Sequence, residues 1–255
     1  QDPGEKALQS EISRLPFKHV EWEFKFTDAK IRRMTVQGDH LYVETTANEL
    51  IAVDRFVGAV RWIYRVDSNR PLDFPPIVAQ GVPQTISLLE KELFEINRKI
   101  DEKEQRAKRL SELPGEDVKN LQKLRSEKRE KLKVSRFGDN VYFLSQQELY
   151  CLDRMSGKLR WTRRLDFVPS AQPTATQFYI FVSAANKARV YVLTVKQKGV
   201  VADYFRADIG SRQNQITTKP VFEDPVVYFV SHDGKVYFYS VSEKSGGTPL
   251  KTQGP

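Results

Sequence analysis

The chain has 255 residues, of which 40% are hydrophobic and 11% aromatic, with a formal net charge of +8 and a single cysteine. This composition supplies enough apolar side chains for a packed core, so it excludes a disordered or collagen-like chain. No run approaches the roughly 18 consecutive apolar residues that a transmembrane helix needs. One cysteine excludes both an intrachain disulfide and a cysteine-rich zinc site.

The chain opens with an N-terminal extension, residues 1–17, whose apolar residues have helical spacing and predict at most a short docking helix. Its first residues, Gln1–Gly4, lack an initiator methionine. They fit either the end left by removal of a signal peptide or an arbitrary chain boundary. The next segment, Val20–Phe24, has the alternation of a strand around Trp22 and resembles the last strand of a repeat.

An internal repeat is the strongest signal in the sequence. Residues Glu49–Trp62 align without gaps on Glu148–Trp161, and Glu, Leu, Asp, Arg, Gly, Arg and Trp coincide. Each copy predicts short antiparallel strands joined by a turn, in which Asp bonds the following backbone and Gly accepts a positive φ. The residues expected to shape these two turns are Asp54, Gly58, Asp153 and Gly157.

Two weaker copies of the unit follow. Tyr179–Ser183 and Val190–Val192 form one of them, and Val227–Ser231 and Val236–Phe238 form the other. The turn His232–Gly234 of the last copy contains Asp-Gly between alternating apolar strands, which is a strong hairpin signal.

The spacing of the units indicates the fold class. Trp22 precedes Trp62 by one unit, and four-stranded units of about 40 to 45 residues are typical of propeller blades. The sequence therefore predicts a mainly β fold, a β-propeller of four-stranded antiparallel blades, with four blades per chain over residues 18–82 and 134–242. The last unit shows no evident outer strand, and the strand around Trp22 is free to complete it. Residues 243–255 predict a flexible tail.

Residues 83–133 interrupt the second blade between its innermost strand and the next one. About half of these residues are charged, and apolar residues recur at alternating steps of three and four, the seam of a coiled coil. A break at Leu113–Asp117 predicts an inserted αα-hairpin with arms of about 27 and 16 residues. The shorter return arm leaves part of the seam uncovered, so it rests either on its own blade or on another molecule. The residues assigned to partner or subunit contact are Leu89, Leu93, Ile96 and Ile100.

The sequence offers little candidate chemistry. The three histidines, His19, His40 and His232, are too scattered to predict a metal site. Cys151 lies in a predicted strand, where a buried, inert thiol is expected. One dense basic cluster could bind a polyanion with salt-dependent affinity. Its members are Arg154, Lys158, Arg160, Arg163 and Arg164.

The repeats resemble those of the pyrroloquinoline-quinone-like (PQQ-like) β-propeller family in three segments, Leu50–Trp62, Phe74–Ala79 and Leu149–Trp161. The resemblance is strong in two blades and thinner in the last two, which lack the tryptophan. It implies that the tryptophan of one blade docks against the neighbouring blade. The blade-docking residues expected on this basis are Trp22, Trp62 and Trp161, together with Asp54, Asp153, Gly58 and Gly157.

The resemblance also implies expectations about function. Such propellers usually close with seven or eight blades, so either a tight four-bladed ring or a dimeric eight-bladed ring is expected here. Quinoprotein dehydrogenases share the fold but need a metal-bound cofactor and acidic residues that this sequence does not bring together. The chain is therefore expected to be a non-enzymatic scaffold without cofactor that binds proteins or its own copies. Its expected location is extracytoplasmic, in the periplasm or at the outer membrane. The alternatives are a quinoprotein-type enzyme and a polyanion-binding surface.

Overall fold

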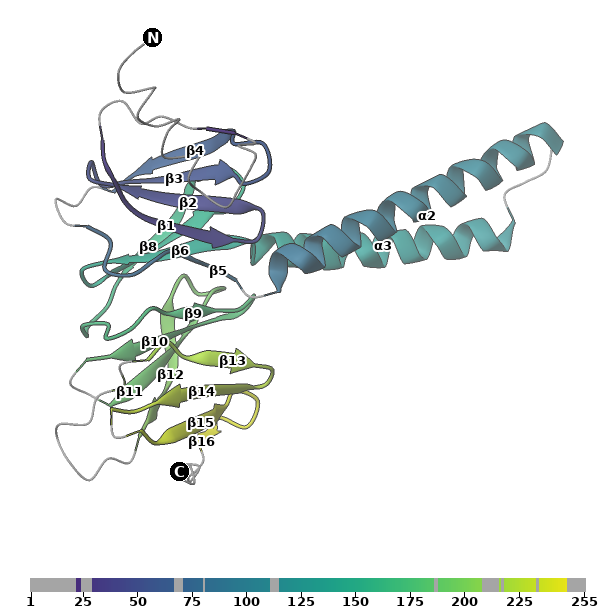
Figure 1. Ribbon diagram of the computed structural model, residues 1–255. Helices are drawn as coiled ribbons and strands as arrows, with labels where there is room; N and C mark the ends of the chain where they lie inside the picture. Colours follow the sequence, from purple (N-terminus) through teal and green to yellow (C-terminus); the bar gives the residue numbers. More distant parts are fainter. Residues whose placement is uncertain are drawn as a thin grey trace, which may run out of the picture. The chain divides into compact units, whose positions relative to one another are not determined.

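The computed structural model describes residues 22–23, 29–66, 71–79, 81–110, 115–185, 188–207, 216, 218–232 and 234–246. These residues form four four-stranded antiparallel sheets and two helices (Figure 1), which confirms the expected mainly β fold of four-stranded blades. The chain divides into two compact units, Gln1–Arg65 and Val66–Pro255. None of the described helices is long and apolar enough to cross a membrane.

The first unit contains one described sheet, in which four strands follow each other in chain order. They are β1 (Ile31–Gln37), β2 (His40–Thr45), β3 (Glu49–Asp54) and β4 (Val60–Arg65). Gly38 makes the tight turn between β1 and β2 with φ +63°, which glycine adopts without a Cβ clash. Val43, Ile51 and Val53 form the apolar core on one face of this sheet. Alternate residues of a strand share one face, which explains the spacing of Ile51 and Val53.

The second unit contains three sheets with the same consecutive strand order. The second sheet consists of β5 (Ile77–Val78), β6 (Asn140–Ser145), β7 (Glu148–Asp153) and β8 (Leu159–Arg164). The third consists of β9 (Thr174–Ala175), β10 (Tyr179–Ala184), β11 (Arg189–Thr194) and β12 (Val200–Arg206). The fourth consists of β13 (Val221–Glu223), β14 (Val226–Val230), β15 (Val236–Ser240) and β16 (Ser245–Gly246).

The hydrophobic core of the second unit lies between successive sheets. One cluster joins Tyr142 of the second sheet to Ile180 of the third. Another joins Phe181 of the third sheet to Phe229 of the fourth. Ile180 and Phe181 are neighbours in β10 and point to opposite faces, so the third sheet buries both of its faces against other sheets.

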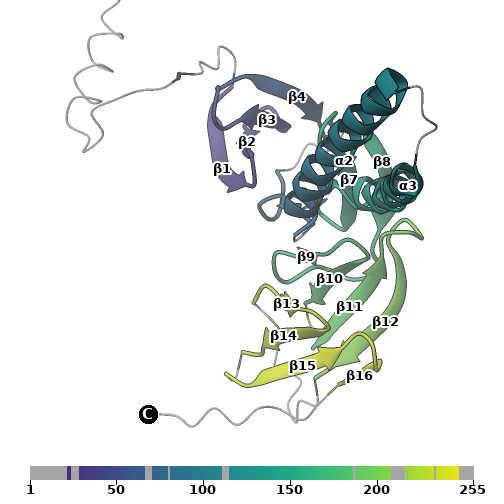
Figure 2. The ribbon, with the colours of Figure 1, turned by 90° about the vertical axis from the view of Figure 1, so that its right-hand side faces the viewer.

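The two helices, α2 (Val82–Leu110) and α3 (Glu116–Phe137), lie between β5 and β6 in the chain and form a helical arm beside the sheets of the second unit (Figures 1 and 2). The acidic first turn of α3, Glu116 and Asp117, suits the positive end of its helix dipole. The helices contain 29 and 22 residues. The expected return arm of about 16 residues is therefore too short, because α3 continues to Phe137.

Both ends of the expected ring differ from the sequence prediction. The last sheet has an outer strand of its own, the two-residue β16, where the sequence showed none. That strand lies inside the segment 243–255 that was predicted to be a flexible tail. Trp22 and Glu23 are not part of a strand. The predicted N-terminal extension, His19 and Asp233 lie outside the described residues.

Candidate functional site: sheet-docking tryptophans and the helical arm

The first repeat turn is built around the carboxylate of Asp54. Oδ1 accepts hydrogen bonds from the backbone N–H groups of Phe56 and Val57, at 3.0 and 3.2 Å. Oδ2 accepts one from Nη2 of Arg61 at 2.5 Å. The hydrogen bond from Arg61 and then the one from Phe56 hold the pKa of Asp54 below its ordinary value. Gly58 closes the turn with φ +69°, and its N–H donates to the carbonyl oxygen of Asp54 at 2.9 Å.

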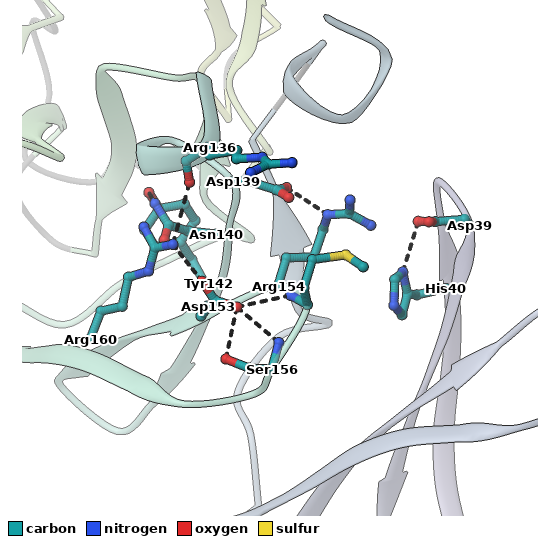
Figure 3. A network of polar contacts seen from close by, with 11 residues as sticks. Asp39, His40, Arg136, Asp139, Asn140, Tyr142, Asp153, Arg154, Ser156 and Arg160 are labelled. Atoms are coloured by element: carbon teal, nitrogen blue, oxygen red, sulfur yellow. Dashed lines mark hydrogen bonds and ion pairs between the residues drawn. The ribbon is translucent and has the colours of Figure 1, made fainter. Parts of the chain in front are cut away.

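The second repeat turn has the same construction (Figure 3). Oδ1 of Asp153 accepts hydrogen bonds from both the N–H and the hydroxyl of Ser156, at 2.8 Å, and Oδ2 accepts one from Arg160 at 2.5 Å. Burial raises the pKa of Asp153, but the hydrogen bonds from Arg160 and Ser156 outweigh burial and leave it below its ordinary value. Gly157 has φ +67°. The turn geometry predicted from the repeat is thus present in both copies.

A tryptophan covers the first of these turns. Nε1 of Trp22 donates to the carbonyl oxygen of Arg55 at 3.0 Å. A Cβ placed on Gly58 would lie only 2.6 Å from the indole, so glycine is needed there both for its positive φ and for the close approach. Trp22 therefore docks on the first sheet through the β3–β4 turn.

Trp161 makes an equivalent contact within the second unit. Its ring covers Gly199, in the β11–β12 turn of the third sheet, where a Cβ would lie 2.9 Å from the indole. Gly199 has φ +75°. The sequence prediction included Trp161 but missed Gly199, although a glycine between two predicted strands was the available signal. Trp161 on Gly199 shows directly how the outer strand of one sheet docks on a turn of the next.

Trp62 and Trp161 each lie beside a tyrosine of another strand in the same sheet. The rings of Tyr42 and Trp62 have centroids 6.0 Å apart at 49°. Tyr142 and Trp161 repeat both values in the second sheet. Trp62 is 7% exposed and so is a core residue of the structure.

The proposed basic cluster loses two of its members to ion pairs. Nε of Arg154 donates to Oδ1 of Asp139 at 2.5 Å, and both side chains are buried (Figure 3). Arg160 is held by Asp153, as described above. The exposed members that remain are Lys158, Arg163 and Arg164. A polyanion surface of five free cations is therefore not formed, since a buried, paired arginine contributes little to a docking surface.

The surroundings of the cysteine thiol and of His40 fit structural roles. Cys151 is fully buried, and burial raises the pKa of its thiol to about 12, so the nucleophilic thiolate is not formed at neutral pH. Nδ1 of His40 lies 2.7 Å from Oδ1 of its neighbour Asp39 (Figure 3). Within the described ranges, no group of three or more His, Cys, Asp or Glu side chains could hold a metal ion.

One carboxyl group of the first sheet stands out. Glu44 in β2 is 3% exposed, and Oε2 lies 3.3 Å from Nη2 of Arg33. Burial raises the pKa of Glu44 to about 7, against the opposing charges of Arg33 and Arg32. This group gives the first sheet a titration near neutral pH.

The apolar seam of α2 is covered by α3. The four seam residues assigned to partner contact, Leu89, Leu93, Ile96 and Ile100, are each at most 8% exposed. Leu132 of α3 packs against the half nearer the sheets, and Val118 packs against the other half. The expected uncovered seam is contradicted by this burial, because Leu132 covers the half nearer the sheets, which the return arm was expected to leave open. The side chains of this seam are not a free contact surface.

The outer surface of the helical arm is charged and carries isolated apolar side chains. Ion pairs join the helices from Lys128 to Glu92 at 2.6 Å and from Arg136 to Glu90 at 2.8 Å. Phe94 is 66% exposed. A groove of about 480 Å³ runs between the helices. Its lining residues are Leu93, Asn97, Arg129, Leu132, Lys133 and Arg136.

The chain was compared with known proteins at three levels. No protein-family model matches it, and no curated protein matches it. Among solved structures, BamB from Moraxella catarrhalis is 16% identical with a TM-score of 0.50, over 84% of this chain and 46% of that chain. The WD40 domain of Neurospora crassa Pan2 is 11% identical with a TM-score of 0.49, over 86% of this chain and 51% of that chain.

The chain thus spans about half the length of the two structures. Because the sequence identities are low, the likeness to BamB concerns the fold alone, and it agrees with the four consecutive four-stranded sheets. The chain has a β-propeller type of fold.

Proposed function

We propose that this chain is a non-catalytic β-propeller scaffold that works by protein–protein assembly outside the cytoplasm, with the helical arm as a contact to a partner and with self-association of the chain. The resemblance of the repeats to the PQQ-like family supports the location, since similar repeat propellers serve in envelope assembly. The β-propeller fold supports the scaffold role, because sheets of this kind present broad faces and turns for docking.

The construction of the helical arm is the observation that carries this proposal. The two large apolar clusters between the sheets of the second unit contain no residue of α2 or α3. The arm closes its own seam instead. An insertion that contributes no residue to these two clusters and forms a core of its own has another role than filling the sheet cores, so we assign it to contact with another molecule.

The arm has one face suited to such a contact. Arg129 and Lys133 lie on the wall of the groove between the helices, and Leu93 and Leu132 contribute apolar atoms to its lining. The exposed basic side chains of this groove fit an acidic segment of a partner protein, because opposite charges steer the encounter.

Removal of the arm tests this proposal. Val78 and Val141 are paired neighbours in β5 and β6, so a short Gly-Ser linker can replace residues 82–137 without separating the strands. The tagged full-length chain and the arm-deleted chain are recovered from the natural host, and the masses of their complexes are compared. We expect the deleted chain to keep its β-type circular dichroism and to lose the larger complex.

A charge reversal provides the matched comparison. Arg129→Glu and Lys133→Glu should weaken the partner complex, whereas Arg163→Glu, on exposed β8, should leave it unchanged. Complexes that survive both deletion and reversal would contradict the role of the arm. Recovery of the chain only from the cytosolic fraction of the host would contradict the proposed location.

A further inference from the structure

The last sheet carries an apolar face on the side opposite to its packed core. Val227 and Phe229 point into the core shared with the third sheet. On the other face, Tyr228 lies between Val221 and Phe238, because the strand register pairs it with both. Val221 is 61% exposed, and the two aromatic side chains are partly exposed. Three adjacent strands thus present a continuous apolar row.

The equivalent row of side chains in the third sheet is covered by the sheet that follows it. Phe181 of β10 pairs with Val192 of β11 just as Tyr228 pairs with Phe238. Phe181 is fully buried, and its ring stacks on Phe222 of β13 with centroids 5.5 Å apart. Tyr228 therefore occupies the position of Phe181. At this position, the third sheet buries an aromatic ring against the innermost strand of the next sheet.

The first sheet presents the complementary surface. Val36 pairs with Leu41 as Phe222 pairs with Val227, so Val36 occupies in β1 the position that Phe222 occupies in β13. Val36 is 57% exposed, and Met34, on the same face, is 58% exposed. This innermost strand has the apolar residues of a docked sheet, and both remain more than half exposed.

The contact of Trp22 supports the same assignment. Trp22 covers Gly58 in the way that Trp161, from the outer strand of the second sheet, covers Gly199 of the third. Trp22 thus takes the place of the tryptophan of a preceding sheet. The last sheet lacks a tryptophan in its two-residue outer strand β16.

We infer that the last sheet of one copy docks on the first sheet of a second copy, with Tyr228 against Val36, and that a second identical contact closes the pair. This inference rests on the self-association in the proposed function and names its surface. Each chain carries one face of each kind, so a two-fold pair satisfies all four faces. One chain covers 46% of the BamB structure, so two copies approximate the length of that propeller fold.

Disulfide trapping between two separately purified variants, each with one introduced cysteine, tests this contact. Val36→Cys and Tyr228→Cys chains are mixed, oxidised and separated on a non-reducing gel. The native Cys151 is fully buried and leaves the new thiols as the reactive pair. We expect a covalent dimer near twice 29.5 kDa in the mixture. A mixture of Val36→Cys with Phe178→Cys, which is 58% exposed in the β9–β10 turn, should give none.

A third substitution tests whether the apolar row itself makes the contact. Adding Phe238→Asp to the Tyr228→Cys chain should abolish the covalent dimer, because a carboxylate in the apolar row loses its hydration on docking. Circular dichroism checks that this chain keeps its β structure. Absence of the dimer from the first mixture would overturn the inference.

The double variant Val36→Cys/Tyr228→Cys distinguishes a second copy from closure within one chain. A fast-migrating, internally linked monomer would overturn the inference by placing the chain's own first sheet at this face. The arm-dependent complexes described above are measured separately, so their persistence would leave the scaffold proposal standing even if the docking surface were wrong.

Discussion

The indole of Trp22 lies over Gly58, so close that a Cβ at that glycine would be 2.6 Å from the ring. The pair joins a residue that precedes the first sheet to the β3–β4 turn of that sheet, and Trp161 repeats the contact on Gly199. A tryptophan over a positive-φ glycine is thus the recurrent docking unit of these sheets.

Gly58→Ala should destabilise the first sheet more than a comparable change elsewhere. The substitution combines a positive φ with a clash against Trp22, which together cost about 2–4 kcal/mol. Gly38→Ala is the control in the same sheet, since Gly38 has φ +63° and nothing within 4 Å of its Cβ position. It should cost only about 1 kcal/mol. Urea unfolding measures both variants, and equal losses would show that the indole contact adds nothing.

Glu44 should make stability depend on pH near neutrality. Because burial raises the pKa of Glu44 in the folded chain to about 7 from its ordinary value of 4.5, the folded chain holds this proton more tightly than the unfolded chain. Stability should therefore fall as the pH rises from about 4.5 to about 7 and then level off, by on the order of 1–3 kcal/mol.

The variant Glu44→Gln should flatten this dependence and be more stable than the parent at about pH 8, where the parent carries a buried charge. Glu49→Gln in the neighbouring strand β3 should keep the parental slope, since Glu44 is then intact. Urea denaturation at about pH 5 and about pH 8 measures all three chains. A Glu44→Gln variant with the parental slope would assign the titration to another group.

Cys151 should be unreactive in the folded chain. Its thiol is fully buried and has a pKa of about 12, so almost no thiolate exists at about pH 8. A thiol reagent should modify no cysteine in the native protein and one cysteine per chain in denaturant. Rapid modification without denaturant would show that the second sheet opens readily or that the thiol is accessible.

Leu93→Asp should unfold the helical arm, whereas Phe94→Asp should not. Leu93 is buried between α2 and α3 at 8% exposure, and its neighbour Phe94 is 66% exposed. Loss of the buried leucine and burial of a carboxylate cost about 2–5 kcal/mol, and an exposed substitution costs within about 0.5 kcal/mol. The helical part of the circular dichroism and the protease resistance of the arm report the difference. An equal effect of both changes would contradict the closed seam.

The repeat made much of the fold accessible from the sequence. Asp54 and Gly58 carry their turn geometry locally, through an aspartate that bonds the next N–H groups and a glycine with positive φ. Their aligned partners Asp153 and Gly157 form the same turn. These features depend on a few neighbouring residues, and a pattern of residue types is therefore sufficient to predict them.

The parts of the sequence prediction that were wrong depend on contacts between residues that are far apart in the chain. Helix α3 runs past the predicted end at residue 133, where Arg160, from β8, donates to the carbonyl oxygen of Arg136 at 3.3 Å. This contact is not visible in the local sequence, where Val134 suits the start of a strand equally well. Arg154 was assigned to a basic surface because its buried partner Asp139 lies in another strand region.

The mass of the chain in solution tests the central claim of self-assembly most directly. Light scattering behind a sizing column, over a range of concentrations, should give a mass near twice 29.5 kDa. Such a dimer would place the exposed faces at Tyr228 and Val36 inside an assembly. A mass of 29.5 kDa at every concentration would contradict self-association and leave the helical arm as the remaining contact surface.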